Sequence, residues 1–174
     1  MSNQIINNMI TRRSCRKFKD DMPSQELIDE VIQAGLYAAS GKGKQCPIIV
    51  AVTNKELRDR LSLMNRKIGG WDSDSFYGAP VVLIVLAPKD VPTYIYDGSL
   101  VIGNMMLAAH SLGLASIWIH RAKQEFESEE GKQILKDLGI EGDYEGIGHC
   151  VIGYAACAEA APIPRKEGRV FYAK

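Results

Sequence analysis

The sequence predicts a single α+β domain in which helices and short strands pack in layers. Three observations lead to this fold class. The length of 174 residues is that of one domain. No internal repeat, low-complexity tract or Gly/Ser linker divides the chain. Short β-branched runs alternate with longer amphipathic segments, so strands and helices mix along the sequence. We therefore expect one domain over residues 1–174, with one core.

Four apolar runs are predicted to be strands because they are short and mostly rich in β-branched residues. They are residues 48–52, 81–86, 115–120 and 148–155. Four helices are predicted where apolar residues recur every three or four positions. They are residues 3–12, a segment after Ser24 that reaches Leu36, residues 54–67 and residues 128–138. Ser24 and Asn54 are suited to cap the free amide groups at two of these helix starts.

A fifth predicted helix, from Asp97 to Gly113, is apolar on nearly every face. Its apolar residues are Leu100, Val101, Ile102, Met105, Met106, Leu107, Ala108, Ala109 and Leu112. Such a helix has to be enclosed by protein on all sides. A domain of this size encloses a helix fully only with difficulty, so we expect this one to lie in a subunit interface.

The composition is that of an ordinary globular protein, with 46% hydrophobic and 24% charged residues. Lys+Arg and Asp+Glu are equal at 21 each, which gives no general attraction to nucleic acid or to an anionic membrane. The N-terminus has no signal-peptide pattern, and no apolar run approaches the roughly 18 residues of a membrane span. The sequence therefore predicts a cytoplasmic protein without nucleic-acid or membrane partners.

Side chains with chemistry of their own are few. The 4 cysteines form no CxxC pair and there are only 3 histidines, so neither a metal site nor a dithiol is expected. Cys15 lies among arginines that would lower its pKa, although a packed small residue is the alternative that we prefer. No Ser/His/Asp constellation or carboxylate pair is present, so we predict no catalytic side chain. An enzyme of this kind relies on a bound cofactor.

Two basic clusters stand at opposite ends of the chain. The segment Arg12-Arg13-Ser14-Cys15-Arg16 can direct guanidinium groups and a hydroxyl at one phosphate. On this pattern alone we prefer the alternative, a solvated basic stretch at a helix C-terminus. The second cluster, Arg165, Lys166 and Arg169, follows two prolines and is able to meet the first around one anion.

A glycine-containing loop, residues 38–47, lies between a predicted helix and a strand. A phosphate-binding loop of the Walker type needs Ser or Thr after Gly-Lys and leads from strand to helix, so ATP binding is disfavoured. Ser40 and Gly41 instead allow close approach of a flat ligand, and Gln45 can pair with a heteroaromatic edge. A plain flexible loop is the alternative. Downstream, Trp118 is compatible with a plain core position, and a histidine such as His120 is more often structural than catalytic.

Taken in order, these segments resemble the nitroreductase family of FMN-dependent oxidoreductases over nearly the whole chain. The segments that carry the resemblance are Arg12-Arg13-Ser14-Cys15-Arg16-Lys17-Phe18, the Ala-Ser-Gly-x-Gly-x-Gln-x-Pro loop, Tyr77-Gly78-Ala79-Pro80, Gly103-Asn104-Met105-Met106-Leu107-Ala108-Ala109, Gly113-Leu114-Ala115-Ser116-Ile117-Trp118 and Ile152-Gly153-Tyr154. The resemblance implies a central, mostly antiparallel sheet flanked by helices. It also implies an intertwined homodimer with two FMN sites at its interface.

The resemblance also implies the site residues. Those expected at the FMN phosphate and ribityl chain are Arg12, Arg13, Ser14 and Arg16, completed by Arg165 or Arg169. Those expected from the partner subunit are Ser40, Gly41 and Gln45, and those expected along the isoalloxazine or ribityl side are Trp118, Ile119 and His120. Many family members have Asn in place of Gly43 and Pro-Trp in place of Cys46-Pro47. The chain is also shorter than the larger nitroreductases, so the substrate is not carried over.

The implied activity is a ping-pong transfer of reducing equivalents from NADH or NADPH, through FMN, to a nitroaromatic, a quinone or a similar small-molecule acceptor. One alternative is a non-catalytic flavin-binding or electron-transfer module with the same phosphate site. Another is a regulatory domain that binds a different nucleotide through the basic clusters.

Overall fold

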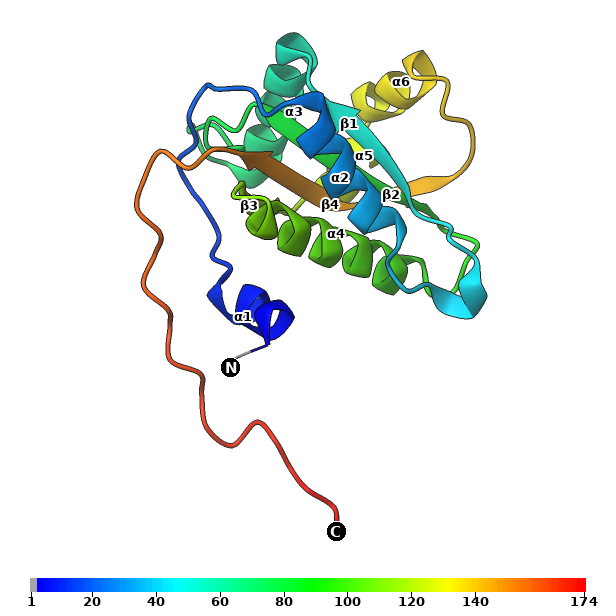
Figure 1. Cartoon of the computed structure of the whole chain (residues 1–174). Coiled ribbons are helices and arrows are strands. Elements are labelled where there is room, and N and C mark those ends of the chain that lie inside the picture. Colours follow the sequence, from blue (N-terminus) through cyan, green and yellow to red (C-terminus); the bar gives the residue numbers. More distant parts are fainter. Residues whose placement is uncertain (1–2) are drawn as a thin grey trace.

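A four-stranded sheet with helices on both faces forms the body of the molecule in the computed structural model (Figure 1). The structure describes residues 3–174, so residues 1 and 2 of the predicted domain lie outside the described residues. The strands are β1 (Ile48–Val52), β2 (Val81–Pro88), β3 (Ala115–Ile119) and β4 (Tyr144–Gly153). Their order is β1-β2-β4-β3, and every neighbouring pair is antiparallel. The expected antiparallel sheet is confirmed.

Six α-helices and one 3₁₀ turn complete the described chain. They are α1 (Gln4–Thr11), α2 (Gln25–Leu36), the 3₁₀ turn (Gly41–Gly43), α3 (Lys55–Gly69), α4 (Tyr94–Ser111), α5 (Ala122–Glu127) and α6 (Glu129–Asp137). The two predicted caps are confirmed: Ser24 accepts a hydrogen bond from the Leu27 amide, and Asn54 accepts one from the Leu57 amide. These side chains fix where α2 and α3 begin because they satisfy amide groups that the helix leaves free.

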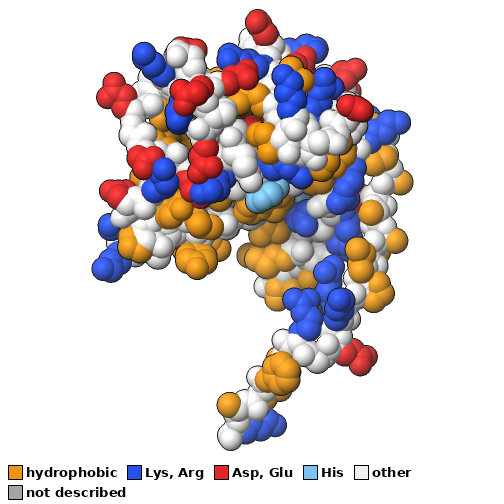
Figure 2. All heavy atoms as spheres, turned by 180° about the vertical axis from the view of Figure 1, so that it is seen from behind, with side chains coloured by type: hydrophobic (Ala, Val, Ile, Leu, Met, Phe, Trp, Pro, Cys, Tyr) orange, Lys and Arg blue, Asp and Glu red, His pale blue; other side chains and the backbone are white. Residues whose placement is uncertain are grey.

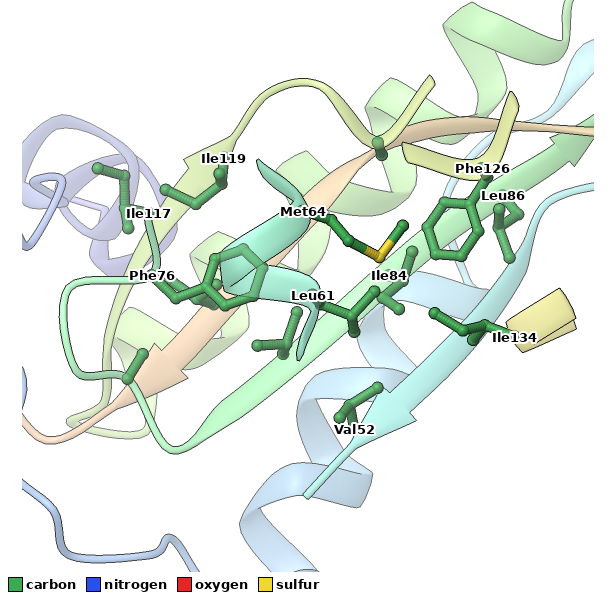
Figure 3. Close-up of a cluster of buried hydrophobic side chains, with 14 of the residues drawn as sticks. Val52, Leu61, Met64, Phe76, Ile84, Leu86, Ile117, Ile119, Phe126 and Ile134 are labelled. Atoms are coloured by element: carbon green, nitrogen blue, oxygen red, sulfur yellow. The ribbon is translucent and has the colours of Figure 1, made fainter. Parts of the chain in front are cut away.

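β2 lies at the centre of the core because both of its faces are covered. Its alternate residues Val81, Leu83 and Val85 belong to the cluster that includes α2 and α4. On the opposite face, Ile84 and Leu86 pack with the helices α3, α5 and α6 (Figure 3). Full burial of such side chains stabilises the fold by about 1.5–3 kcal/mol each. A strand that is buried on both faces needs apolar residues at every position, and β2 has such a continuous apolar run.

Three elements differ from the sequence prediction. α4 begins at Tyr94 rather than Asp97, and the Thr93 hydroxyl donates to the Asp97 carboxylate at 2.9 Å within its first turn. β4 begins at Tyr144 rather than residue 148, because its polar start pairs with the end of β2. α5 was not predicted, since its six residues, AKQEFE, are mostly polar and too few to show a helical repeat.

The expected enclosure of α4 is incomplete in one chain. Val101, Ile102 and Met105 are buried against the sheet, but Tyr96 is 71% exposed and Leu100 is 49% exposed. One chain therefore does not cover every face of this helix, and its expected burial in a subunit interface stays a prediction. An apolar face of α4 remains open to a further partner.

The two chain ends attach to the body differently. The segment after α1 runs beside the edge strand β3, where the Cys15 amide donates to the Ser116 carbonyl at 3.1 Å. Residues 154–156 pair with residues 17–19, where the Ala156 amide donates to the Lys17 carbonyl at 2.9 Å. Beyond them the chain leaves the body as an extended tail without helix or strand (Figure 1). Among residues 3–174, none of the helices combines the length and hydrophobicity that a membrane crossing requires.

Candidate functional site

A cavity of about 310 Å³, here called the basic pocket, lies where the N-terminal segment meets β3. It is bounded by the C-terminal end of α4 and by the first residues of the tail. Its lining includes Arg12, Arg13, Ser14, Cys15, Arg16, His110, Gly113, Leu114, Ala115, Ser116, Ala155, Cys157, Ala158, Glu159 and Ala160. Three of these residues are arginines, so the cavity has the chemistry of an anion site.

The arginines of the basic pocket have unused hydrogen-bond donors. Arg12 Nη1 and Arg13 Nε are buried without a hydrogen-bond partner in residues 3–174. Arg13 Nη1, by contrast, donates to the carbonyls of Ile10 and Arg12 at 2.8 and 2.9 Å, which closes the end of α1. A buried donor without an acceptor costs about 1–3 kcal/mol. A bound anion that supplies acceptors would remove this cost.

Cys15 lies in the wall of the basic pocket and is only 9% exposed. Burial raises the pKa of its thiol, and the neighbouring Cys157 raises it further, although a backbone hydrogen bond with Lys17 lowers it. The alternative of an arginine-lowered pKa is therefore wrong. The preferred interpretation, a small packed residue, agrees with this burial.

A second cavity of about 440 Å³, here called the aromatic pocket, continues along β3. It is lined by Arg16, Asn65, Trp71, Ser73, Asp74, Ser75, Tyr77, Ile117, Trp118, Ile119, His120 and Arg121. Arg16 lines both cavities, so they adjoin at this residue. Together they form a cleft that is cationic at one end and aromatic at the other.

Asp74 anchors the loop that forms one wall of the aromatic pocket. Its carboxylate accepts hydrogen bonds from Arg58 Nη2 at 2.5 Å, from the Gly78 amide at 2.6 Å and from the Phe76 amide at 3.1 Å. Burial raises its pKa, but these bonds and one from the Ser62 hydroxyl outweigh burial and lower the pKa to about 2. The ionised Asp74 therefore holds the loop in one conformation.

On the opposite side of the loop, a cation packs against an aromatic ring. The Arg121 guanidinium carbon lies 4.1 Å from the centroid of the Trp71 ring. Arg121 has a φ of 80°, in the left-handed region that a non-glycine residue rarely adopts. This contact joins the end of β3 to the loop after α3.

The exposed edge of β3 offers backbone groups to the cleft. The Ser116 carbonyl points away from β4, because it accepts from Cys15. Backbone groups alternate in direction along a strand, so the amide and carbonyl of Trp118 also point toward the open edge. An edge strand leaves such groups free for a ligand. The polar edge of a heteroaromatic ring can form hydrogen bonds with these free amide and carbonyl groups.

The structure brings together most of the predicted site residues. Those in the basic pocket are Arg12, Arg13, Ser14 and Arg16, and those in the aromatic pocket are Trp118, Ile119 and His120, with Arg16 in both. The tail residues Arg165 and Arg169 are exposed and line neither cavity. The two basic clusters therefore do not meet within one chain.

The glycine loop lies far from the cleft of its own chain. The Gly41 amide donates to Asp97 at 3.0 Å, near the N-terminal end of α4, and Ser40 Oγ accepts from the Gln45 amide. The basic pocket lies at the other end of α4. Since α4 has 18 residues, its ends are about 27 Å apart at 1.5 Å per residue. Within one chain, the glycine loop and the basic pocket therefore cannot contact the same end of a ligand.

Several residues of the aromatic pocket are absent from the sequence prediction. They are Asn65, Trp71, Ser73, Asp74, Ser75 and Arg121, while Tyr77 was noted only within a motif. The run from Gly69 to Gly78 combines glycines with aromatic and acidic residues, which marks a special loop. Its position beside β3 depends on the strand order, which the residues alone do not reveal. No cluster of three or more potential metal ligands occurs within residues 3–174.

The fold is that of an α+β protein, with two adjoining cavities at the edge strand β3, one of them lined by three arginines. Residues 9–154 match the model of the Nitroreductase family, and the chain belongs to that family. A provisionally named NADH dehydrogenase/NAD(P)H nitroreductase of Methanothermobacter thermautotrophicus is 30% identical over 118 residues, which are 66% of this chain and 59% of that protein. The chain thus matches less than two thirds of that relative.

Solved structures give longer matches. A nitroreductase with bound FMN from Bacteroides fragilis superposes with a TM-score of 0.89 at 26% identity, covering 99% of this chain and 100% of that one. A nitroreductase with bound FMN from Desulfitobacterium hafniense gives the same TM-score and identity, covering 100% of both chains. The α+β fold expected from the sequence is confirmed for the described residues.

Proposed function

We propose that the chain binds FMN in the cleft along β3 and transfers reducing equivalents from NADH or NADPH to an electron-poor small molecule. The observation that carries the proposal is the cleft itself, with arginine donors that have no partner in residues 3–174 at one end and aromatic side chains at the other. Two similar structures bind FMN, and the similar archaeal protein is named for NAD(P)H chemistry. A nitroaromatic or a quinone is the proposed acceptor class, in a ping-pong cycle.

The residues of the basic pocket fit a phosphate monoester. Arg12 and Arg13 each have a buried N–H group without an acceptor in the described chain, and Ser14 adds a hydroxyl. Charge-assisted bonds of this kind are about twice as strong as neutral ones. Arg16 reaches the junction of the two pockets, where it would meet the middle of an elongated ligand.

The residues of the aromatic pocket fit a flat heteroaromatic ring. Trp118, Ile119 and His120 form the β3 side, and Trp118 presents its backbone amide and carbonyl at the open edge. When bound there, FMN would accept and return a hydride, so the protein need only bind, orient and exclude water. The cationic Arg16 would favour the extra negative charge of a reduced ring.

We further propose a homodimer that completes each site. The space-filling view shows hydrophobic side chains gathered beside the hollow between body and tail and along the tail itself (Figure 2). Exposed hydrophobic residues of α1, α4 and the tail are Ile5, Ile6, Met9, Ile10, Ile95, Tyr96, Leu100, Ile163, Val170, Phe171 and Tyr172. Exposed apolar surface of this extent is typical of an interface. A second copy would cover it.

A dimer also explains the placement of the glycine loop and the tail. Ser40, Gly41 and Gln45 lie near the end of α4 opposite to the basic pocket of their own chain, so we propose that they approach the flavin of the partner. Arg165 or Arg169 on the extended tail would likewise complete a phosphate site across the interface. The cytoplasmic location stays a prediction.

The first experiment is the absorption spectrum of the purified protein, followed by anaerobic titration with NADH and NADPH. We expect flavin bands that disappear with one of the two nicotinamides. Bands that disappear with dithionite but with neither nicotinamide would instead support the electron-transfer module. A protein that is colourless and ignores added FMN would overturn the proposal and favour another nucleotide as ligand.

Subunit complementation tests the shared site. Arg16→Ala and Gln45→Glu should each abolish FMN-dependent activity in their own homodimer. When the two variants are unfolded and refolded together, half of the dimers are mixed, and each mixed dimer has one site without either substitution. We therefore expect activity to return to about a quarter of the wild-type level for a two-fold symmetric dimer. Absence of any recovery in a dimeric mixture would show that both residues act on the same chain's flavin.

A further inference from the structure

Three polar side chains are completely buried behind the aromatic pocket. They are Asn65 of α3, Glu125 of α5 and His149 of β4, each with 0% exposure. His149 Nε2 lies 3.0 Å from Glu125 Oε2, and Asn65 Nδ2 donates to the other oxygen of Glu125. Buried polar groups in contact like these form a network whose loss is costly, so its presence calls for an explanation. The three residues are here called the buried cluster.

The buried cluster holds the backbone at the end of β3. Asn65 Nδ2 donates to the His120 carbonyl at 2.7 Å, and His149 Nδ1 lies 3.4 Å from the Ile119 carbonyl. Ile119 and His120 both line the aromatic pocket. The cluster therefore connects α3, α5 and β4 to the segment that forms the wall of the proposed ring site.

The contacts of the cluster are satisfied by two protons. A carbonyl only accepts, so His149 Nδ1 makes a long hydrogen bond to the Ile119 carbonyl when it carries a proton. The contact between Nε2 and Glu125 needs one more proton, on either the imidazole or the carboxyl group. With two protons the pair has no net charge, and loss of either would leave two acceptors facing each other. The Phe76 ring, with its centroid 5.3 Å from that of His149, packs against the imidazole.

Two energetically unfavourable features occur in or beside the buried cluster. Asn65 uses its amide hydrogens on Glu125 and His120, and its Oδ1 is buried without a hydrogen-bond partner in the described chain. Arg121, the residue after His120, has a φ of 80°. Folded proteins keep such unfavourable features mainly where a functional site requires a particular backbone conformation.

We propose that Asn65, Glu125 and His149 are positioning residues that hold the backbone of Ile119–Arg121 in the conformation that receives the flavin ring. The proposal rests on the proposed function, since the ring is that of FMN. The cluster acts through the carbonyls of Ile119 and His120. Without it, the turn at Arg121 relaxes and the end of β3 no longer presents its edge to the ring.

Two substitutions of Glu125 separate hydrogen bonding from simple volume. Glu125→Leu removes the acceptor of Asn65 and the partner of His149 while it preserves most of the bulk. Glu125→Gln keeps both contacts, because its oxygen accepts from Asn65 and its amide donates to a neutral His149. Asn65→Leu, which leaves the Glu125–His149 pair in place, serves as a second variant if Glu125→Leu does not fold. Ile28→Ala is the matched control, a fully buried residue of the α2 side that lines neither pocket.

The first readout is hydrogen exchange of the apoprotein, which does not require FMN to bind. We expect the peptide that contains residues 117–122 to exchange at least about tenfold faster in Glu125→Leu, consistent with loss of buried hydrogen bonds. Glu125→Gln and Ile28→Ala should exchange there like the wild type. Equal exchange in Glu125→Leu and wild type would overturn the proposal. So would faster exchange in Ile28→Ala by the same factor.

The second readout is the FMN dissociation constant, measured by quenching of flavin fluorescence. Glu125→Leu and Asn65→Leu should bind about tenfold more weakly, while Glu125→Gln stays within about threefold of the wild type. If Glu125→Gln loses as much affinity as Glu125→Leu, hydrogen bonding is not what positions the wall, and the proposal fails. If the wild type itself does not bind FMN, the proposed function fails. The hydrogen-exchange measurement still tests whether the buried cluster positions the turn.

Discussion

Asp74 gives a stability prediction whose size follows from the structure. The hydrogen bonds from Arg58, Ser62 and two backbone amides lower its pKa from 3.8 to about 2. At about 1.36 kcal/mol per pKa unit, this shift corresponds to roughly 2.4 kcal/mol. The side chain is 35% exposed, so solvent screening reduces the expected contribution to about 1–2 kcal/mol. A lowered pKa stabilises the fold above the unfolded value, and the contribution is lost as the pH falls from about 4 to about 2.

The perturbation is Asp74→Asn, and the assay is urea unfolding of wild type and variant at several pH values. The free energy of unfolding should be lower in the variant by at least about 1–2 kcal/mol at pH 7, where the wild-type carboxylate is ionised. The difference should remain constant to about pH 5 and shrink between pH 4 and pH 2. Asp90→Asn, at an exposed position, is the control and should show no such dependence. A difference that persists unchanged at pH 2, or that is missing at pH 7, would refute the reasoning.

The remaining predictions concern packing and thiol reactivity. Leu61→Ala should reduce the free energy of unfolding by about 2–5 kcal/mol in urea titration, because Leu61 is 0% exposed; a loss below 1 kcal/mol would contradict this packing. Gly131→Ala should destabilise by about 1–3 kcal/mol, since the added Cβ would lie 2.0 Å from the Glu125 carbonyl oxygen; an unchanged melting temperature would show that the backbone can move apart. Iodoacetamide at pH 8 should alkylate the exposed Cys157 before Cys15, whose pKa burial raises, as followed by peptide mass spectrometry; equal rates would disprove the burial of Cys15.

The sequence identified the segments of the candidate site that have local chemistry, but not the residues that tertiary packing brings beside them. The segment from Arg12 to Arg16 and the strand containing Trp118 were identified because guanidinium groups and an apolar run have recognisable local chemistry. The loop around Asp74 was missed, because its role depends on Arg58, which approaches from α3 sixteen positions away in sequence. Such contacts exist only after α3 has packed on the sheet.

The buried cluster also consists of contacts that the local sequence does not reveal. Asn65, Glu125 and His149 come from α3, α5 and β4, and nothing in their local sequence distinguishes them from surface or structural residues. Glu125 in particular lies in a short, mostly polar helix that the apolar repeat did not predict. A carboxylate in such a segment is ordinarily exposed. Only the packing of α5 against β4 buries it.

By itself, the sequence determined the α+β class, the strands, the helix caps and the family, because apolar periodicity, capping chemistry and ordered motifs are local properties. The tertiary structure decided which edge of the sheet is open, where the two pockets join at Arg16, and which polar groups become buried. These depend on antiparallel pairing and helix packing, which bring distant segments together. The physical reason is that burial and hydrogen-bond partners are set by neighbours in space.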